Sequence, residues 1–168
     1  RGVRKIRLSG GEPLVRRDFG ELAHRIGRHL NHGSLEELTL TTNGTRLAQH
    51  AAMLADAGVR RINVSVDTLD PAAYTFITRG GDINDVFAGL KAAHSEGIAI
   101  KINMVALKGV NDDQFLPMAR WCAAQGHDLT LIETMPLGVI DDDRADRYMP
   151  LSHAVAAIEA EHPLSPLP

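Results

Sequence analysis

A regular alternation of short apolar stretches and longer amphipathic stretches constrains the fold of this chain more than any other feature. One pair of stretches spans roughly 30 residues, which is the size of a βαβ repeat. The expected strands are residues 3–8, 37–42, 61–66, 98–107 and 129–133. Strands that are joined by helices become parallel through right-handed crossovers. The alternation therefore predicts an α/β fold, either a barrel or an open doubly wound sheet.

The helices between these strands have recognisable ends. Asp18, followed three residues later by Glu21, fits a capping box at the start of the first helix. The next three helices are expected to end near a glycine, which adopts the left-handed conformation at a helix end without a steric penalty. These glycines are Gly58, Gly97 and Gly126. A further, weakly indicated helix is expected after Ser152.

The faces of the strands favour one of the two architectures. A buried parallel strand should be apolar on both faces, but here one face is polar in strand after strand. Asn63 and Ser65 alternate with apolar residues in one strand, and Lys101 does so in another. Such a polar face should line a wet or liganded cavity, because buried polar groups need partners. We expect an incomplete TIM-like barrel of about four βα units and a fifth strand, formed by residues 1–168 as a single domain.

Composition excludes several classes of protein. The 168 residues carry a formal net charge of −3, which gives no general argument for a nucleic acid or an acidic membrane as partner. No apolar run is long enough to span a bilayer. Cys122 is the single cysteine, which excludes a disulfide framework and favours an intracellular, cytoplasmic protein. It lies on the apolar face of its helix and is expected to be a buried structural thiol.

The strongest local signal is the run Gly10-Gly11-Glu12-Pro13, directly after the first expected strand. Two glycines let the backbone approach a ligand closely, and Glu12 supplies a negative charge suited to an α-amino group. Ligands of α/β folds bind at the carboxyl ends of the strands, where this run lies. On these four residues alone, a tight turn with a solvated glutamate is an equally good interpretation.

Two cations stand out because they fall inside expected strands, on the polar face. Arg7 and Lys101 would be costly there without a partner, and a triphosphate is a natural one. An internal ion pair to Asp67 or Glu133 is the alternative, because buried charges are usually paired within the protein.

Five blocks of sequence resemble the GTP 3′,8-cyclases, a family of radical S-adenosylmethionine enzymes, in order and in spacing. They are residues 5–18, 40–44, 60–67, 108–112 and 132–136. Radical S-adenosylmethionine enzymes in general share the Gly-Gly-Glu-Pro run. The Arg-Arg-Ile-Asn-Val-Ser and Lys-Gly-Val-Asn-Asp runs are more specific to this family. The resemblance covers essentially all of residues 1–150.

The resemblance implies a half-open barrel of six βα units that holds S-adenosylmethionine and GTP. In the family, a reduced iron–sulfur cluster cleaves S-adenosylmethionine to methionine and a 5′-deoxyadenosyl radical, which removes the 3′ hydrogen of GTP. The ribose radical then attacks C8 of guanine and gives 3′,8-cyclo-7,8-dihydro-GTP. The reaction is that of a lyase and begins the biosynthesis of the molybdenum cofactor. A homodimer is also implied.

The resemblance further implies roles for single residues. The positions that match S-adenosylmethionine contacts are Gly10, Gly11, Glu12, Ser65 and Met135. The positions that match GTP contacts are Arg7, Thr41 and Lys101. Without the resemblance, the hydroxyls of Thr41 and Ser65 would be interpreted as structural and Met135 as a core residue.

The chain departs from the family at the cysteines. The family holds two [4Fe–4S] clusters, each on three cysteines, and none of these has a counterpart here. We therefore expect a fragment that ligates no metal and cannot itself cleave S-adenosylmethionine. Thr130 stands where many relatives have a basic residue, so no phosphate contact is expected there. Two alternatives stay open: another radical S-adenosylmethionine enzyme, such as a peptide-modifying one, and a non-catalytic half-barrel that binds nucleotide.

Overall fold

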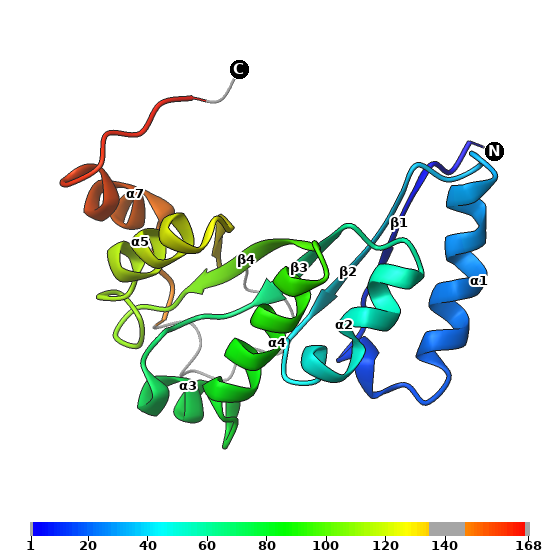
Figure 1. The fold of residues 1–168 in the computed structure, drawn as a ribbon. Helices are drawn as coiled ribbons and strands as arrows, with labels where there is room; N and C mark the ends of the chain where they lie inside the picture. Colours follow the sequence, from blue (N-terminus) through cyan, green and yellow to red (C-terminus); the bar gives the residue numbers. More distant parts are fainter. Residues whose placement is uncertain (1, 135–146, 167–168) are drawn as a thin grey trace. The chain divides into compact units, whose positions relative to one another are not determined.

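Five strands alternate with helices in the part of the chain that the structure describes (Figure 1). The computed structural model describes residues 2–134 and 147–166. The strands are β1 (Lys5–Leu8), β2 (Glu37–Thr42), β3 (Arg61–Ser65), β4 (Ala99–Ala106) and β5 (Asp128–Glu133), and their order in the sheet is β1-β2-β3-β4-β5. Strand β1 pairs with β2, and β2 with β3, in parallel. Each predicted strand is confirmed, with ends that differ by one or two residues at most.

The predicted helices are confirmed as well, and two further elements accompany them. The helices are α1 (Phe19–Asn31), α2 (Leu47–Asp56), α3 (Pro71–Thr78), α4 (Ile83–Ser95), α5 (Phe115–Gln125) and α7 (Leu151–Glu159), with a 3₁₀ turn η1 (Pro13–Val15). Neither α3 nor η1 was predicted from the sequence. Both begin with proline at the first helical position after an acidic cap, Glu12 for η1 and Asp70 for α3. None of the helices in the described part of the chain has the length and apolarity needed to cross a membrane.

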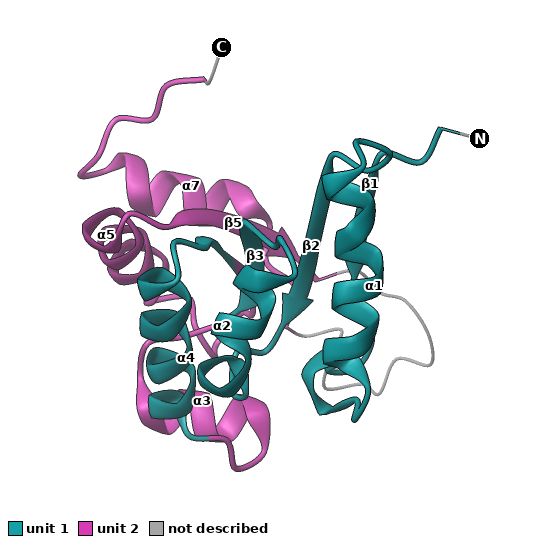
Figure 2. Ribbon diagram, turned by 45° about the vertical axis from the view of Figure 1, so that its right-hand side comes forward, with its two compact units in different colours: residues 1–65, 82–102 teal, residues 66–81, 103–168 magenta. Residues whose placement is uncertain are grey.

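The chain divides into two compact units (Figure 2). The first consists of residues 1–65 and 82–102, and the second of residues 66–81 and 103–168. The first unit thus contains β1, β2, β3, the beginning of β4, and helices α1, α2 and α4. All the predicted site residues before residue 135 belong to this first unit.

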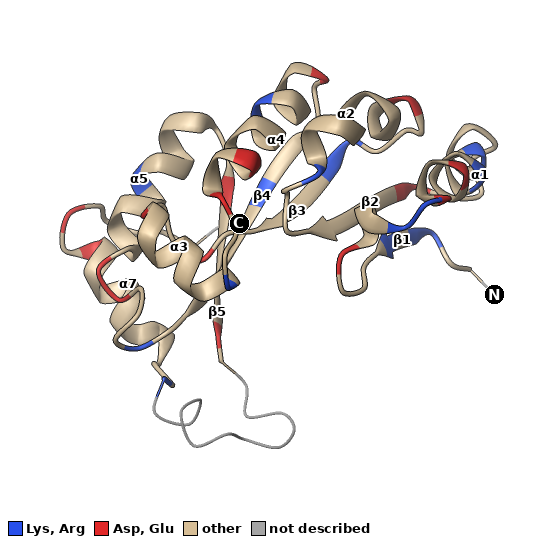
Figure 3. Ribbon diagram, turned by 90° about the horizontal axis from the view of Figure 1, so that it is seen from below, with Lys and Arg blue, Asp and Glu red and all other residues tan. Residues whose placement is uncertain are grey.

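The core of the first unit lies between its strands and the helices α2 and α4, which pack side by side (Figures 1 and 2). Ile62 and Val64 of β3 and Ile100 and Ile102 of β4 are buried there. The residues between them point to the other face of the sheet, because side chains alternate along a strand. The predicted division into an apolar and a polar strand face is confirmed. Basic residues stand among the polar-face positions of β1 and β4 (Figure 3).

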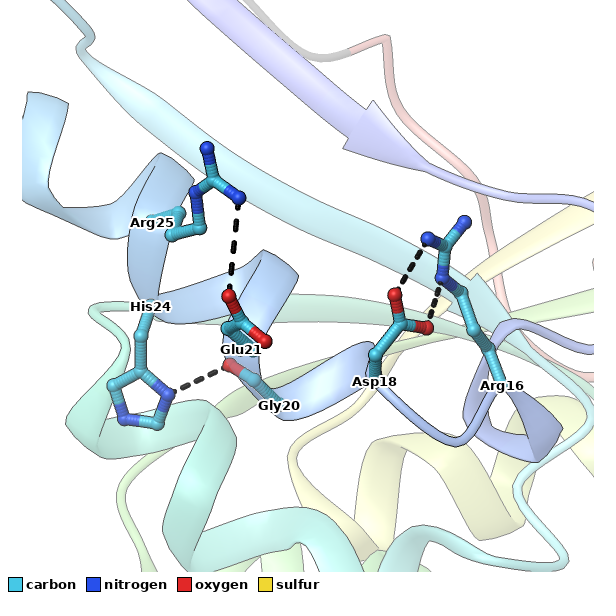
Figure 4. Close-up of polar contacts among 6 residues, drawn as sticks. All are labelled: Arg16, Asp18, Gly20, Glu21, His24 and Arg25. Carbon is cyan, nitrogen blue, oxygen red and sulfur yellow. Dashed lines mark hydrogen bonds and ion pairs between the residues drawn. The ribbon is translucent and has the colours of Figure 1, made fainter.

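The predicted capping box at the start of α1 is wrong. Asp18 occupies the cap position, but its side chain accepts no hydrogen bond from the helix. It instead accepts two from the guanidinium of Arg16, at 2.5 Å and 2.8 Å (Figure 4). Glu21 lies 3.8 Å from the guanidinium of Arg25 on the next turn. A bidentate, charge-assisted pair is stronger than one bond to a neutral backbone N–H, so it takes the carboxylate away from the cap.

The Lys-Gly-Val-Asn-Asp block has a structural explanation inside the second unit. Asn111 is fully buried, and its Nδ2 donates hydrogen bonds to the carbonyl oxygens of Asp67 at 2.6 Å and Val105 at 2.9 Å. Its Oδ1 accepts from the N–H of Leu107 at 2.8 Å. One amide therefore joins the segment after β3 to the end of β4 and to the turn that follows it.

Candidate functional site

The loop after β1 has a fixed shape that its own sequence explains. Glu12 caps η1, and its Oε1 accepts a hydrogen bond from the N–H of Leu14 at 3.0 Å. Pro13 follows at the first helical position, where a missing N–H costs nothing. The loop is therefore a preformed element at the carboxyl end of β1.

The carboxylate of Glu12 also ties this loop to the end of β2. The hydroxyl of Thr42 donates to Oε1 at 2.8 Å, and the N–H of Asn43 donates to Oε2 at 2.7 Å. The interpretation of Glu12 as a solvated glutamate is therefore wrong. A carboxylate has about four acceptor positions, so one on Oε2 remains for a further donor.

Gly10 and Gly11 leave open space beside the loop. Both are exposed, and Gly10 has a φ of +157°. A Cβ added to either glycine would meet no atom within 4 Å. The backbone of this loop can therefore be approached closely by a ligand, as the Gly-Gly run predicts.

Polar side chains form two levels on the other strands of the first unit, and in the lower level Thr39 and Arg61 have partners within the protein. Arg7 lies opposite Thr39, and Thr39 lies opposite Arg61. The Thr39 hydroxyl donates to the carbonyl oxygen of Arg61 at 2.7 Å, and the Arg61 guanidinium lies 2.8 Å from Oε1 of Glu37. The hydrogen bond from Arg61 to Glu37 is the main reason that the pKa of Glu37 lies below its usual value. The positive charges of Arg61, Lys5 and Arg7 lower it further.

The upper level lacks such partners. Thr41 lies opposite Asn63. The N–H of Ala99 donates to the carbonyl oxygen of Arg60 at 2.9 Å, and in a parallel ladder this bond puts Lys101 opposite Asn63. Among the described residues of the first unit, the side chains of Thr41 and Lys101, both half-buried, find no hydrogen-bond or ion-pair partner. Asn63 is 5% exposed, and its Oδ1 is buried with no hydrogen-bond partner.

The two predicted cations differ in their surroundings. Arg7 is exposed, whereas Lys101 is half-buried, and neither forms an ion pair with a described carboxylate of the first unit. Asp67 and Glu133 belong to the second unit, where they accept hydrogen bonds from the N–H groups of Val105 and Leu151. The internal ion pairs to Asp67 or Glu133 stay an alternative.

Ser65 is the last residue of β3 and is exposed, and its assignment to a ligand stays a prediction. Met135 lies outside the described residues. The structure thus brings the loop residues 10–12 to the end of β2, and Thr41 and Lys101 to one level across β3. Arg7 stands one level lower.

Three residues of the site, Thr42, Asn43 and Asn63, were not predicted from the sequence. Thr42 and Asn43 hold the Glu12 carboxylate, and Asn63 stands between Thr41 and Lys101. Strand alternation already put Asn63 on the polar face. No signal in the sequence revealed that its amide is buried without a partner, or that Glu12 reaches residues 30 positions away.

No cluster of metal ligands is formed by the residues that the structure describes. Cys122 is 2% exposed in α5, and burial raises the pKa of its thiol to about 11. A thiol in that state is a poor metal ligand, which confirms the prediction of a structural cysteine. The donor groups of this chain therefore do not fit an iron–sulfur cluster.

Comparison with known proteins identifies the family. Residues 1–122 match the family model of the radical SAM superfamily. The chain belongs to this superfamily.

Solved structures show the same fold at low sequence identity. Methylornithine synthase matches 94% of the chain, with a TM-score of 0.70 and 14% identity, over 48% of its own length. Coproporphyrinogen III oxidase from Escherichia coli matches 94%, with a TM-score of 0.67 and 16% identity, over 39% of its own length. The predicted fold class, a partial TIM-like barrel of the radical SAM type, is confirmed.

Curated relatives named GTP 3′,8-cyclase are more similar. A GTP 3′,8-cyclase of Rhodopseudomonas palustris (strain TIE-1) is 55% identical over all of this chain and 49% of its own length. A GTP 3′,8-cyclase of Agrobacterium fabrum is 56% identical over 95% of this chain and 46% of its own length. The resemblance seen in the five blocks is confirmed. The chain spans about half the length of these relatives.

Proposed function

We propose that this chain is part of a GTP 3′,8-cyclase and contributes binding residues for GTP and S-adenosylmethionine. The observation that carries the proposal is the upper level of the polar face, where the half-buried side chain of Lys101 has no partner among the described residues of its own unit. Thr41 shares this level, two strands away. An unpaired cation in a strand is costly, and a bound phosphate would offset that cost. Arg7 would meet the same ligand from the lower level.

The S-adenosylmethionine part of the proposal rests on the loop after β1. The open backbone of Gly10 and Gly11 and the remaining acceptor position of Glu12 suit an amino acid ligand, whose ammonium donates and whose carboxylate accepts. Ser65 offers a hydroxyl at the end of β3. Met135 is assigned to the same ligand by resemblance alone. One of the similar folds, anSMEcpe, was solved with bound AdoMet, at 18% identity and a TM-score of 0.63 over 79% of this chain and 36% of its own.

The full reaction needs more than this chain holds. In the radical SAM superfamily an iron–sulfur cluster supplies the electron that cleaves S-adenosylmethionine, and we propose two [4Fe–4S] clusters for the full-length protein. The thiolates for both would come from outside these 168 residues, because the only cysteine here is Cys122. No step through a cluster is therefore derived from this chain. We also propose that the full-length protein is cytoplasmic and begins molybdenum cofactor biosynthesis, with support from the single thiol and from the relatives' name. That it forms a homodimer is proposed from the resemblance alone.

Lys101→Met in the full-length protein tests the GTP part of the proposal. Methionine keeps most of the stem volume and removes the charge. We expect GTP affinity to fall at least tenfold, because a hydrogen bond to a charged group contributes about 1.5–3 kcal/mol. The free energy of unfolding without ligand should stay the same or rise, since an isolated half-buried cation disfavours the fold. Calorimetry and denaturant unfolding measure the two quantities.

Lys91→Met provides the matched control, because Lys91 is an exposed lysine on α4 and should affect neither quantity. A loss of about 3–5 kcal/mol in stability with unchanged GTP affinity would instead identify Lys101 as half of an internal ion pair. That outcome would reject its role in substrate binding.

A further inference from the structure

Asn63 is an unusual residue for the middle of a packed strand. Its side chain is 5% exposed, and its Oδ1 is fully buried without a hydrogen-bond partner. The great majority of buried polar side-chain atoms in proteins have a partner, because an unsatisfied one costs about 1–3 kcal/mol. A group held in this state calls for an explanation.

The other buried asparagine of the described chain shows what a structural amide looks like here. Asn111 uses Nδ2 for two hydrogen bonds and Oδ1 for a third, all to backbone groups of its own unit. Asn63 has a similar degree of burial and none of these bonds. Its amide therefore does not perform a structural task of this kind.

The neighbours of Asn63 point to a ligand. Thr41 on one side and Lys101 on the other share its level, and neither side chain has a partner in the described part of the first unit. One level lower, Thr39 and Arg61 are fully engaged with backbone and carboxylate. Three adjacent unpartnered polar groups, above a row in which both Thr39 and Arg61 have partners and only the exposed Arg7 has none, are the arrangement of a site that is completed by a bound molecule.

We propose that Oδ1 of Asn63 accepts a hydrogen bond from a ribose hydroxyl of the bound nucleotide, an assignment that rests on the proposed function. Lys101 attracts a phosphate, but an ionised phosphate has no hydrogen to give to Oδ1. The acceptor needs an O–H or N–H donor. Asn63 lies on the strand next to that of Lys101, and neighbouring strands are about 4.8 Å apart. In a nucleotide, the donor-bearing group next to the phosphates is the ribose.

The first test needs no ligand and uses Asn→Leu at both buried asparagines of the full-length protein. Leucine has nearly the shape of asparagine and no polar atoms. Asn63→Leu should leave the melting temperature unchanged or raise it, because it removes an unsatisfied buried acceptor. Asn111→Leu should lower it by several degrees, because three backbone groups lose their partners. A loss for Asn63→Leu as large as that for Asn111→Leu would overturn the assignment.

The second test compares GTP with 2′-deoxyGTP and 3′-deoxyGTP. Wild-type protein should bind one of the two deoxynucleotides about tenfold more weakly than GTP, which corresponds to about 1.4 kcal/mol. Asn63→Leu should bind GTP about tenfold more weakly and no longer distinguish it from that deoxynucleotide, since each change removes the same hydrogen bond. Asn63→Ala serves as a second variant with the same expected loss of discrimination.

The outcomes separate this assignment from the proposed function. If GTP binding depends on Lys101 while Asn63→Leu binds GTP normally, or still distinguishes the deoxynucleotide, only the assignment of Asn63 is overturned. If the wild-type protein does not bind GTP at all, the proposed function fails and the assignment fails with it.

Discussion

Glu12 has a structural role in its loop beside its proposed role in ligand binding, and the sequence alone could not separate the two. One oxygen caps η1 and accepts from the hydroxyl of Thr42, and the other accepts from the N–H of Asn43. The residue therefore fixes the shape of the loop whose backbone is open at Gly10 and Gly11. Its remaining acceptor position can still meet an ammonium directly.

Glu12→Gln in the full-length protein should weaken S-adenosylmethionine binding and spare GTP. The change keeps the shape and removes the charge, and a charge-assisted hydrogen bond contributes about 1.5–3 kcal/mol. A smaller loss of stability should accompany it, because the amide NH₂ of glutamine would face at least one N–H or O–H donor. Calorimetry with each ligand separately measures the effect. Glu21→Gln, an exposed change on α1, is the control. Equal losses for both ligands would show that Glu12 supports the fold only.

Part of the candidate site could be predicted from the sequence. The rest depends on contacts between residues that are distant in the chain. Alternation along β3 and β4 put Asn63 and Lys101 on the polar face, and the Gly-Gly-Glu-Pro run located the loop. The satisfaction of each polar group depends on partners that are distant in the chain. Thr42 lies 30 positions from Glu12, and the burial of Asn63 depends on the register of three strands.

At the scale of elements, a single histidine links α1 to α2 in a pH-dependent way. Nδ1 of His24 lies 2.7 Å from the carbonyl oxygen of Gly20, and Nε2 lies 2.9 Å from Oδ2 of Asp56 (Figure 4 shows the first contact). Both partners are acceptors, so both bonds exist together only when both ring nitrogens carry hydrogen. These bonds, that to Asp56 first, raise the pKa of His24.

His24→Ala should therefore lower the melting temperature at acidic pH and not at alkaline pH. A raised folded-state pKa means that the stabilisation is fully present below the ordinary value of 6.5 and is lost as pH rises through the folded value. The effect should be small, because both side chains are exposed. Thermal scans between about pH 5 and pH 9 measure it. Arg25→Ala, which breaks an exposed ion pair with Glu21 on the same helix, is the control. An effect of His24→Ala that does not change with pH would contradict this account.

Helix α4 packs closely against the start of α2 because Gly89 has no side chain. A Cβ at Gly89 would lie 2.6 Å from the carbonyl oxygen of Gly44 and 2.8 Å from Cβ of Leu47. Gly89→Ala should therefore destabilise the protein by about 1–3 kcal/mol, as overpacking does.

Gly20→Ala on α1 is the matched control, because its Cβ would meet only Met53 at 3.7 Å. The control should be neutral or stabilising by up to about 1 kcal/mol, through helix propensity. Denaturant unfolding would refute the packing argument if both variants behaved alike.

The elements themselves were largely predictable because their signals are local. Apolar alternation identified every strand, and Gly126 ends α5 in the left-handed conformation, as predicted. The capping box failed because Arg16, two residues away, binds Asp18 more strongly than the helix N–H groups do. Helix α3 was missed because its short apolar run lies between two loops and carries no helical period long enough to stand out.

At the scale of the whole molecule, the chain carries about half of the length of its relatives and divides into two compact units. That residues 1–168 form a single domain stays a prediction. Strands β1 and β5 end the strand order. Unpaired edges invite association, so the isolated chain should tend to aggregate.

The isolated 168-residue chain should bind no iron–sulfur cluster and release no 5′-deoxyadenosine from S-adenosylmethionine. A [4Fe–4S] cluster is held by several cysteine thiolates, and this chain has one cysteine. That thiol is buried in α5, and its pKa is raised to about 11, so it is neither exposed nor ionised at neutral pH. Anaerobic reconstitution with iron and sulfide, followed by absorbance spectroscopy and chromatography of the nucleoside products, measures both expectations. The full-length protein, treated in parallel, should take up iron and release 5′-deoxyadenosine. Stoichiometric cluster on the isolated chain would show that ligands other than cysteine hold it and would refute the assignment of cluster binding to the rest of the protein.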